Sequence, residues 1–362
     1  MGRALSRPLL TVLATAGRGE GRGHLARALA IAEAAHEARI PCAIALFRGV
    51  PSTAERERAS ACEAAWASPG AAARLAGPGL PVEASPQAPA LAPVALGAPP
   101  GPLIVDLPDP NEAGPADLAR ATVFDDRQLL ASLARVVVQP SLPTWSPAPG
   151  GRAERALVGY MFAPLGRAML LVRGERQPSN GGADDAAGAA NLTPPRVLAC
   201  FGGSDPHDVT ARLGVALAAD PRWSVEIVVG PDYRGAAAAR GLFVLREPSD
   251  LAGLLAAADV AVLGAGTMKF EAAALGTPAL LVAVADDQLP VGPVFAATGA
   301  TAWAGDGRTV DPAIVVRILA TLILDPGRRA DMARRGPEVV PGDGARRIVA
   351  ATMTEIGTEG AD

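Results

Sequence analysis

The sequence is poor in the residues that build metal and redox sites. Its three cysteines lie far apart, with neither the spacing of a metal site nor that of a disulfide framework, so we expect buried or free thiols in a reducing cytoplasm. These residues are Cys42, Cys62 and Cys200. There are only three histidines, and no two of them are four residues apart, which argues against a zinc or iron site. We therefore expect no bound metal and no cofactor.

Lysine is almost absent, and the sequence lacks both a basic surface and a long apolar run. Lys269 is the only lysine, the arginines are scattered, and the formal net charge is −4. Nucleic-acid binding needs clustered positive charge, so this class is excluded. No apolar run reaches the roughly 18 residues of a transmembrane segment. We interpret Leu9–Ala16 as a strand rather than a signal peptide, because a glycine-rich turn follows it directly, and we expect a cytoplasmic protein.

The chain does contain a regular alternation of short apolar segments with segments rich in Ala and Leu. This alternation indicates βαβ units and parallel sheets, and 362 residues suit two domains of about 150 residues each. Residues 174–195 are small and polar, so we expect a flexible linker or surface insertion there. The prediction is an N-terminal Rossmann-like domain over residues 8–173, a C-terminal Rossmann-like domain over residues 196–345, and a polar tail over residues 346–362.

The apolar pattern also predicts individual elements. The predicted strands are Leu9–Ala14, Pro41–Leu46, Leu103–Val105, Thr122–Phe124, Val136–Val138, Arg196–Cys200, Val225–Val229, Val260–Leu263 and Ala279–Val284. The predicted helices are Leu25–Glu37, His207–Ala218, Leu251–Ala257, Met268–Leu275 and Pro312–Ala333.

Three of the resulting strand–turn–helix junctions can bind an anion. Such turns lie at the carboxyl edge of a parallel sheet, where α/β proteins bind ligands, and helix N-termini favour negative charge. The first turn, residues 17–24, fits neither the phosphate-loop pattern nor the dinucleotide pattern. It places His24 at the start of a helix, where a neutral imidazole can act as a general base. The alternative is that His24 only caps the helix.

The second turn begins at residue 201 and reads Phe-Gly-Gly-Ser-Asp-Pro. Gly202 and Gly203 allow a phosphate to approach the backbone closely. We expect Ser204 or Asp205 to cap the following helix and Pro206 to lie in its first turn. A capped helix without any ligand is the alternative.

The third turn precedes the helix predicted over Met268–Leu275. Gly266 and Thr267 open that helix, and Glu271 lies one turn further on, where its carboxylate can accept two hydrogen bonds from a ribose diol. The alternative for Glu271 is a solvated helix residue. Asp287 and Gln288 follow the next strand and are expected at the same edge.

Taken in order, these motifs resemble the UDP-sugar hydrolases of the pseudaminic-acid pathway and the related spore-coat polysaccharide proteins. The matching segments are Gly21-x-Gly23-His24-x-x-Arg27, Val123–Asp126, Gly159–Leu165, Phe201–Pro206 and Ala265-Gly266-Thr267-x-x-x-Glu271. Each motif is weak on its own, but the ordered set runs from about residue 9 to residue 300.

The resemblance implies the glycosyltransferase-B fold, in which two Rossmann-like domains with parallel sheets face a central cleft. It further implies that loops of the second domain hold UDP, that His24 is the catalytic base, and that Glu271 binds the ribose. The expected nucleotide-sugar-binding residues are Gly21, Gly23, Gly202, Gly203, Ser204, Asp205, Gly266, Thr267, Glu271, Asp287 and Gln288.

Two departures from the family pattern concern the site itself. Asp106 is followed by Leu107 and Pro108, whereas the hydrolases carry an Asp-x-Tyr motif, so that tyrosine is missing. Asp287 stands where the family favours Asn, which adds negative charge beside a pyrophosphate and weakens binding unless an arginine or a metal compensates.

The sequence therefore predicts an enzyme that processes a UDP-sugar, with UDP as leaving group, in surface-glycan or nonulosonic-acid biosynthesis. Water as nucleophile gives hydrolysis, and a sugar hydroxyl of an acceptor gives glycosyl transfer; one site geometry serves both. A non-catalytic nucleotide-sugar binding protein is the third reading, favoured by the missing tyrosine and by Asp287.

Overall fold

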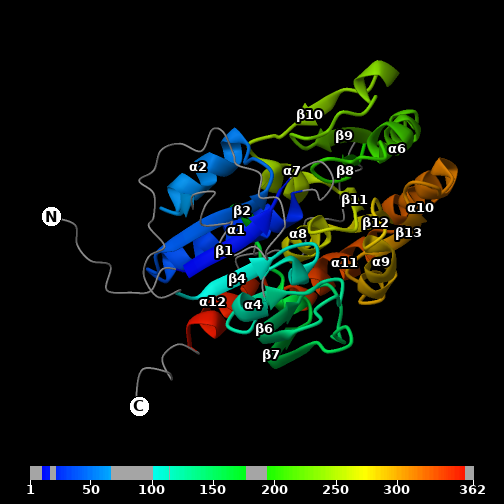
Figure 1. Ribbon diagram of the computed structural model, residues 1–362. Coiled ribbons are helices and arrows are strands. Elements are labelled where there is room, and N and C mark those ends of the chain that lie inside the picture. Colours follow the sequence, from blue (N-terminus) through cyan, green and yellow to red (C-terminus); the bar gives the residue numbers. More distant parts are fainter. Residues whose placement is uncertain (1–9, 17–21, 67–100, 114, 177–193, 355–362) are drawn as a thin grey trace, which may run out of the picture. The chain divides into compact units, whose positions relative to one another are not determined.

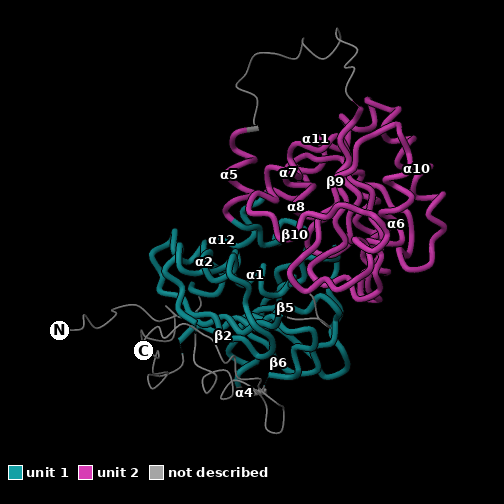
Figure 2. Tube along the Cα trace, turned by 90° about the horizontal axis from the view of Figure 1, so that it is seen from above, with its two compact units in different colours: residues 1–166, 342–362 teal, residues 167–341 magenta. Residues whose placement is uncertain are grey.

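The computed structural model describes residues 10–16, 22–66, 101–113, 115–176 and 194–354. The chain forms two compact units (Figure 2). Unit 1 comprises residues 1–166 and 342–362, and unit 2 comprises residues 167–341. Across the described ranges, no helix has both the length and the apolar character needed to cross a membrane.

Unit 1 is built on seven parallel strands in the order β3-β2-β1-β4-β5-β6-β7 (Figure 1). The strands are β1 (Leu10–Thr15), β2 (Cys42–Arg48), β3 (Ala65–Trp66), β4 (Leu103–Asp106), β5 (Thr122–Phe124), β6 (Leu133–Gln139) and β7 (Arg152–Val158). The helices are α1 (Gly23–Glu37), α2 (Thr53–Ala61), α4 (Pro115–Leu118) and α12 (Gly344–Thr354). Successive residues of β1 point to opposite faces: Val12 packs in the layer that contains α1, and Leu13 packs with Phe47 and Val105 in the other layer.

Unit 2 is a second parallel sheet, with the order β10-β9-β8-β11-β12-β13. Its strands are β8 (Arg196–Cys200), β9 (Ser224–Val229), β10 (Val244–Arg246), β11 (Val260–Gly264), β12 (Ala279–Ala283) and β13 (Ala302–Asp306). Its helices are α5 (Arg167–Arg176), α6 (Val209–Ala218), α7 (Leu251–Ala257), α8 (Met268–Leu275), α9 (Gln288–Ala296), α10 (Pro312–Leu324) and α11 (Pro326–Val339). The prediction of two α/β units with parallel sheets is confirmed, whereas the predicted cleft between them stays a prediction.

The single helix expected over Pro312–Ala333 is wrong, because the chain breaks it at Asp325. Asp325 lies before Pro326, where the helical conformation is disfavoured, and it has extended-like angles of φ −116° and ψ 84°. Its side chain then accepts a hydrogen bond of 2.8 Å from the N–H of Arg328 and so caps α11. Two helices, α10 and α11, replace the one predicted.

The C-terminal end also differs from the polar tail expected over residues 346–362. Residues up to Thr354 belong to α12, which packs on α1 and β6 of unit 1 rather than ending the second domain. Its apolar face buries Ile348 and Val349, and Thr352 shares a hydrogen bond of 2.8 Å with Thr122. The polar residues on the opposite face hid this amphipathic pattern.

The boundary between the units differs from the predicted one as well. Unit 2 begins at Arg167, so that α5 belongs to it, and residues 174–176 complete that helix instead of starting a linker. The rest of the predicted linker, residues 177–193, lies outside the described residues.

Candidate functional site

The order of strands in unit 1 identifies one position at the edge of the sheet where a ligand is expected. From β1 the chain passes through α1 to β2 on one side, while β4 pairs with β1 on the other side. Crossovers that leave in opposite directions open a crevice at the carboxyl ends of the two central strands. His24 in α1 and Asp106 at the end of β4 flank this position.

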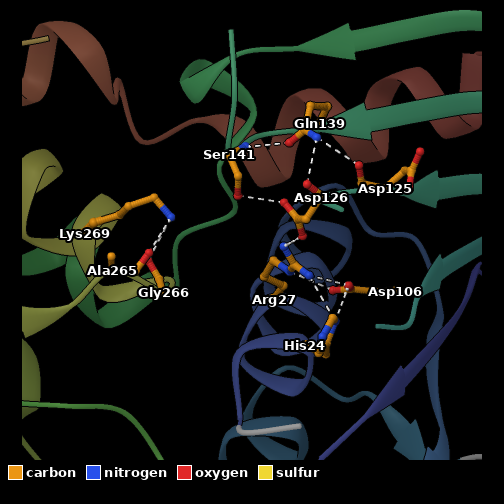
Figure 3. Close-up of polar contacts among 10 residues, drawn as sticks. All are labelled: His24, Arg27, Asp106, Asp125, Asp126, Gln139, Ser141, Ala265, Gly266 and Lys269. Carbon is orange, nitrogen blue, oxygen red and sulfur yellow. Dashed lines mark hydrogen bonds and ion pairs between the residues drawn. The ribbon is translucent and has the colours of Figure 1, made fainter. Parts of the chain in front are cut away.

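His24 and Asp106 are in direct contact there (Figure 3). Nδ1 of His24 lies 2.7 Å from Oδ1 of Asp106, whose side chain is completely buried. Nδ1 of His24 also lies 3.0 Å from Nη2 of Arg27, which can only donate, whereas the carboxylate of Asp106 can only accept. We assign the hydrogen to Nδ1 because the contact with Asp106 is the shorter one, and this tautomer leaves the lone pair on Nε2. Among the described residues no hydrogen bond involves Nε2, and 17% of the His24 side chain is exposed. The ring therefore has the orientation of a general base, and His24 does not cap α1.

Arg27, one turn after His24 in α1, fixes the carboxylate of Asp106. Its Nε donates to Oδ2 at 2.9 Å and its Nη2 donates to Oδ1 at 2.6 Å, which is a bidentate pair. The guanidinium lies over the ring of Phe124, 4.7 Å from its centroid. Burial by itself lowers the pKa of Arg27, but the charges of Asp106 and Asp126 outweigh it and raise that pKa. Arg27 thus stays charged and holds the side chain of Asp106 in place beside His24.

Asp126 extends this network along the edge of the sheet. It forms an ion pair with Nη1 of Arg27 and accepts a hydrogen bond of 2.7 Å from the hydroxyl of Ser141. Burial raises its pKa, but Arg27 and Ser141 together lower the pKa below the ordinary value of 3.8. Gln139, the last residue of β6, donates to the carbonyl of Asp126 at 3.1 Å and accepts from the N–H of Ser141 at 2.9 Å. The four side chains His24, Arg27, Asp106 and Asp126 therefore form one continuous charged network.

The neighbouring Asp125 has a structural role instead. Its Oδ1 accepts from the N–H groups of Leu129 and Leu130, at 2.7 and 3.3 Å, and its Oδ2 accepts from the indole of Trp145 at 2.8 Å. These bonds fold the loop after β5 and point the Asp125 carboxylate away from Arg27. Of the acidic pair in the sequence, only Asp126 joins the His24 network.

In unit 2, the turn after β8 folds differently from the expectation. The helix α6 begins at Val209 rather than His207, and its N-cap is Asp208, so the predictions of a Ser204 or Asp205 N-cap and of Pro206 in the first turn are wrong. Asp205 still contributes, since its carboxylate accepts from the N–H groups of Val209 and Thr210 at 3.0 and 2.7 Å. The amides at this helix N-terminus are thus taken up by the protein's own carboxylates.

The glycines of that turn remain available for a ligand. Gly202 has φ +97°, a conformation that side chains disfavour. The N–H groups of Gly203 and Ser204 have no hydrogen-bond acceptor within the described part of the chain. An anion at this turn is therefore held by the loop amides before α6 rather than by the helix itself.

The turns after β11 and β12 lie together at the carboxyl edge of the same sheet. A side chain added at Gly266 would come 3.4 Å from Nε2 of Gln288, and the Oε1 atom of Gln288 accepts from the N–H of Val284 at 3.1 Å. Thr267 precedes α8 and makes no side-chain cap, and the N–H of Phe270 donates to the carbonyl of Thr267 at 2.9 Å. Glu271 is half-buried in α8 and lies close enough to Cys200, at the end of β8, to contribute to the raised pKa of that thiol.

The three cysteines are buried and free, as expected. Burial raises the pKa of Cys200 to about 12, and Cys42 has a pKa raised to about 12 for the same reason. All three therefore stay protonated and act as small apolar residues.

The predicted site residues separate by unit. The structure places Gly23 and His24 at the start of α1, while Gly21 lies outside the described residues. The other predicted residues line the carboxyl edge of unit 2: Gly202, Gly203, Ser204, Asp205, Gly266, Thr267, Glu271, Asp287 and Gln288.

The sequence interpretation missed the partners of His24. Asp106 was noticed only for the tyrosine that it lacks, and Arg27 and Asp126 only as parts of motifs. The available signal was a carboxylate at the end of a buried strand, which in a parallel sheet lies at the functional edge.

Two Rossmann-like units of parallel sheet are the architecture of the glycosyltransferase-B fold. No known family profile matches the chain. The structure of CalG4, the calicheamicin glycosyltransferase, aligns with a TM-score of 0.57 at 15% identity, over 99% of this chain and 100% of that one. The UDP-GlcNAc 2-epimerase of Neisseria meningitidis bound to UDP-GlcNAc aligns with a TM-score of 0.56 at 12% identity, over 96% and 99%.

A sequence relative narrows the comparison. Over 166 residues, 42% of this chain, the sequence is 25% identical to the spore coat polysaccharide biosynthesis protein SpsG of Bacillus subtilis. The match covers 48% of that protein, so the chain spans about half the length of the curated relative it matches. The fold is thus shared with enzymes named for glycosyl transfer and for epimerisation, and the partial sequence likeness is to a polysaccharide biosynthesis protein.

Proposed function

We propose that this chain is an enzyme that acts on a UDP-sugar and most resembles a hydrolase that releases UDP. The observation that carries the proposal is the contact between His24 and the buried Asp106 at the switch point of the unit 1 sheet. The likeness to SpsG and to a fold that binds UDP-GlcNAc in the Neisseria epimerase supports a nucleotide sugar as substrate.

In the proposed reaction, His24 is the general base. Water attacks the anomeric carbon, the bond from that carbon to the phosphate oxygen breaks, and its electron pair leaves with UDP. Nε2 of His24 takes the proton of the water, a contribution of roughly 10²–10⁴-fold. With a neutral imidazole, Arg27, Asp106 and Asp126 together carry one net negative charge. Proton uptake by His24 neutralises this charge, so the network stabilises the imidazolium as it forms.

The proposed nucleotide site lies on unit 2. The amides of Gly203 and Ser204 supply hydrogen-bond donors for a diphosphate whose charge grows as the sugar departs, and the helix dipole at the N-terminus of α8 favours the same charge. Glu271, further along α8, is assigned to the ribose hydroxyls.

Glycosyl transfer is the alternative, because an acceptor hydroxyl replaces water without any change in the roles of His24 and Asp106. The enzyme then has to keep water out until the acceptor binds. The distinction is therefore one of nucleophile, and only a measurement of products decides it.

The test incubates the full chain with a panel of UDP-sugars in ¹⁸O-labelled water and analyses the products by mass spectrometry. Hydrolysis at the anomeric carbon places ¹⁸O in the free sugar and leaves UDP unlabelled. His24→Asn is the control, because its amide can still donate to Asp106 but has no basic nitrogen, so it should bind UDP and lack turnover.

Other results of the same test favour the alternative functions. Turnover only after an acceptor is added favours the transferase, and a UDP-sugar recovered with altered stereochemistry favours an epimerase. UDP binding without turnover across the panel supports a non-catalytic binding protein. A chain that binds no UDP contradicts the proposal altogether.

A further inference from the structure

Arg308 occupies an unusual position at the carboxyl edge of unit 2. It follows β13, and its Nε and Nη2 donate to Asp306 at 2.9 and 2.8 Å. The remaining nitrogen, Nη1, forms an ion pair of 2.7 Å with Asp286, in the turn after β12. The hydrogen bonds to Asp306 and then to Asp286 raise the pKa of Arg308, so the guanidinium carries a permanent charge.

The chain contains a second copy of the same local motif, which serves as a comparison. Asp220 and Arg222 have the Asp-x-Arg spacing of Asp306 and Arg308, with Nε and Nη2 of Arg222 donating to Asp220 at 2.8 and 2.5 Å. In both copies the N–H of the arginine also donates to Oδ1 of the aspartate, at 3.1 and 2.9 Å. Arg222 precedes β9, at the amino end of the sheet, and Asp220 is its only acidic partner among the described residues.

The second acidic partner of Arg308, Asp286, is thus the feature to explain. Asp286 is 88% exposed, whereas the side chain of Arg308 is 21% exposed. Asp286 belongs to the same turn as Asp287 and Gln288, and Gln288 lies beside Gly266. On the other side, the hydrogen bond from Arg308 lowers the pKa of Asp306, and His207, from the turn after β8, is near enough to add to this effect. Arg308 therefore lies at the edge to which the turns after β8 and β12 also contribute.

We propose that Arg308 binds the diphosphate of the nucleotide by exchanging Asp286 for a phosphate oxygen. This inference rests on the proposed function and names the cation that it requires. It also bears on the charge problem posed by Asp287, because Arg308 supplies a positive charge among the acidic residues of this edge.

The exchange is energetically accessible because Asp286 makes a single exposed contact with the guanidinium of Arg308, whereas Asp306 makes two. An exposed ion pair such as that with Asp286 contributes little to stability, so Nη1 leaves it at little cost. Asp306 meanwhile holds Nε and Nη2 and keeps the guanidinium oriented. A phosphate oxygen then gains a charge-assisted hydrogen bond from a group that is already in place.

The test measures binding of UDP and of uridine by calorimetry at low salt, with the full chain and three variants. Arg308→Gln should weaken UDP binding by about tenfold and leave uridine binding unchanged, since uridine has no phosphate. Asp286→Asn should tighten UDP binding by about two- to fivefold, because it removes the competing carboxylate. Arg222→Gln, which removes the same pair at the opposite end of the sheet, should change neither.

The outcomes separate this inference from the proposed function. If the wild-type chain binds UDP and Arg308→Gln binds it equally well, the assignment of Arg308 is wrong while the nucleotide site stands. Weaker UDP binding by Asp286→Asn also overturns the exchange, because the aspartate would then be needed in the complex. If the wild-type chain binds no UDP, both proposals fail. Matching melting temperatures of the variants establish that each one is folded.

Discussion

The carboxyl edges of the two sheets differ in the groups that they present. In unit 1 the edge carries ionisable side chains joined in one network: His24, Arg27, Asp106 and Asp126. In unit 2 the equivalent central strands end at Cys200 and Gly264, and the turns that follow present glycines and main-chain amides. The same strand arrangement therefore presents ionisable side chains in one unit and main-chain groups in the other, because the fold supplies the edge and the residues supply the chemistry.

The two edges also differ in the partners that their groups need to be stable. A buried arginine in unit 1 is tolerated only because two carboxylates neutralise it, so each member of the network depends on the others. In unit 2, Asp205 and Asp208 satisfy the amides of α6, and Nζ of Lys269 donates to the carbonyls of Ala265 and Gly266 at 3.0 Å. We therefore expect substitutions in unit 1 to act on turnover and stability, and substitutions in unit 2 to act on nucleotide affinity.

The largest effect is expected from the base and its partner. His24→Asn and Asp106→Asn should each lower kcat by roughly 10²–10⁴-fold, the first by removing the proton acceptor and the second by releasing the tautomer. The double variant should be no slower than the slower single variant, because the pair works as one unit. Steady-state kinetics of UDP release measure all three. If the loss of kcat in the double variant equals the product of the two single losses, the pairing of His24 with Asp106 is contradicted.

A large loss of stability is expected from the same carboxylate. Asp106→Asn leaves the buried Arg27 with one charged partner, and the free energy of unfolding should fall by about 3 kcal/mol. Denaturant unfolding of the full chain measures this change. Glu37→Gln, which removes the exposed partner of Arg346, is the matched control and should cost at most about 1 kcal/mol. Equal losses in the two variants would show that Arg27 does not depend on Asp106.

The pH dependence of stability tests the outer part of the network. The pKa of Asp126 is lowered below 3.8 in the folded chain. Its ionised form therefore stabilises the fold fully at pH values above the pKa that Asp126 has in the unfolded chain. This contribution disappears as the pH falls through the pKa of the folded chain. Asp126→Asn should therefore be less stable than the wild type at pH 7, by about 1 kcal/mol. The gap should narrow below pH 4. A gap that is constant between pH 7 and pH 3 would contradict the ion pair with Arg27.

The smallest effect is expected in unit 2. Gly266→Ala brings a methyl group 3.4 Å from Nε2 of Gln288, which should weaken UDP binding by about fivefold through crowding while kcat stays unchanged. Gly174→Ala is the control, because its added carbon meets nothing within 4 Å. Calorimetry and kinetics on both variants check the prediction. A fall in kcat with unchanged affinity would reverse the roles assigned to the two edges.

The turns were the most predictable part of the candidate site. Glycine after a buried strand identified the starts of α1 and α8, and the bounds of α7 and α8 were predicted correctly. The start of α6 was not predicted correctly, because Ser204, Asp205 and Asp208 are all residues that can cap a helix. The side chain of Asp208 also contacts Tyr233 and Ala236 in another turn, and no local pattern predicts these contacts. The docking of α12 on unit 1 was equally out of reach, since its partner α1 lies some three hundred residues earlier in the chain.

The amino-acid sequence by itself determined the alternation of strands and helices and the presence of His24 at a helix start, because periodicity and glycine turns act over a few residues. Only the tertiary structure decided that Asp106 is the partner of His24 and that Arg27 joins Asp106 to Asp126. These pairs are 79 to 99 residues apart and meet because β4 and β5 follow β1 in the sheet. That order is set by how two faces of apolar side chains pack between helices, which no local pattern in the chain records.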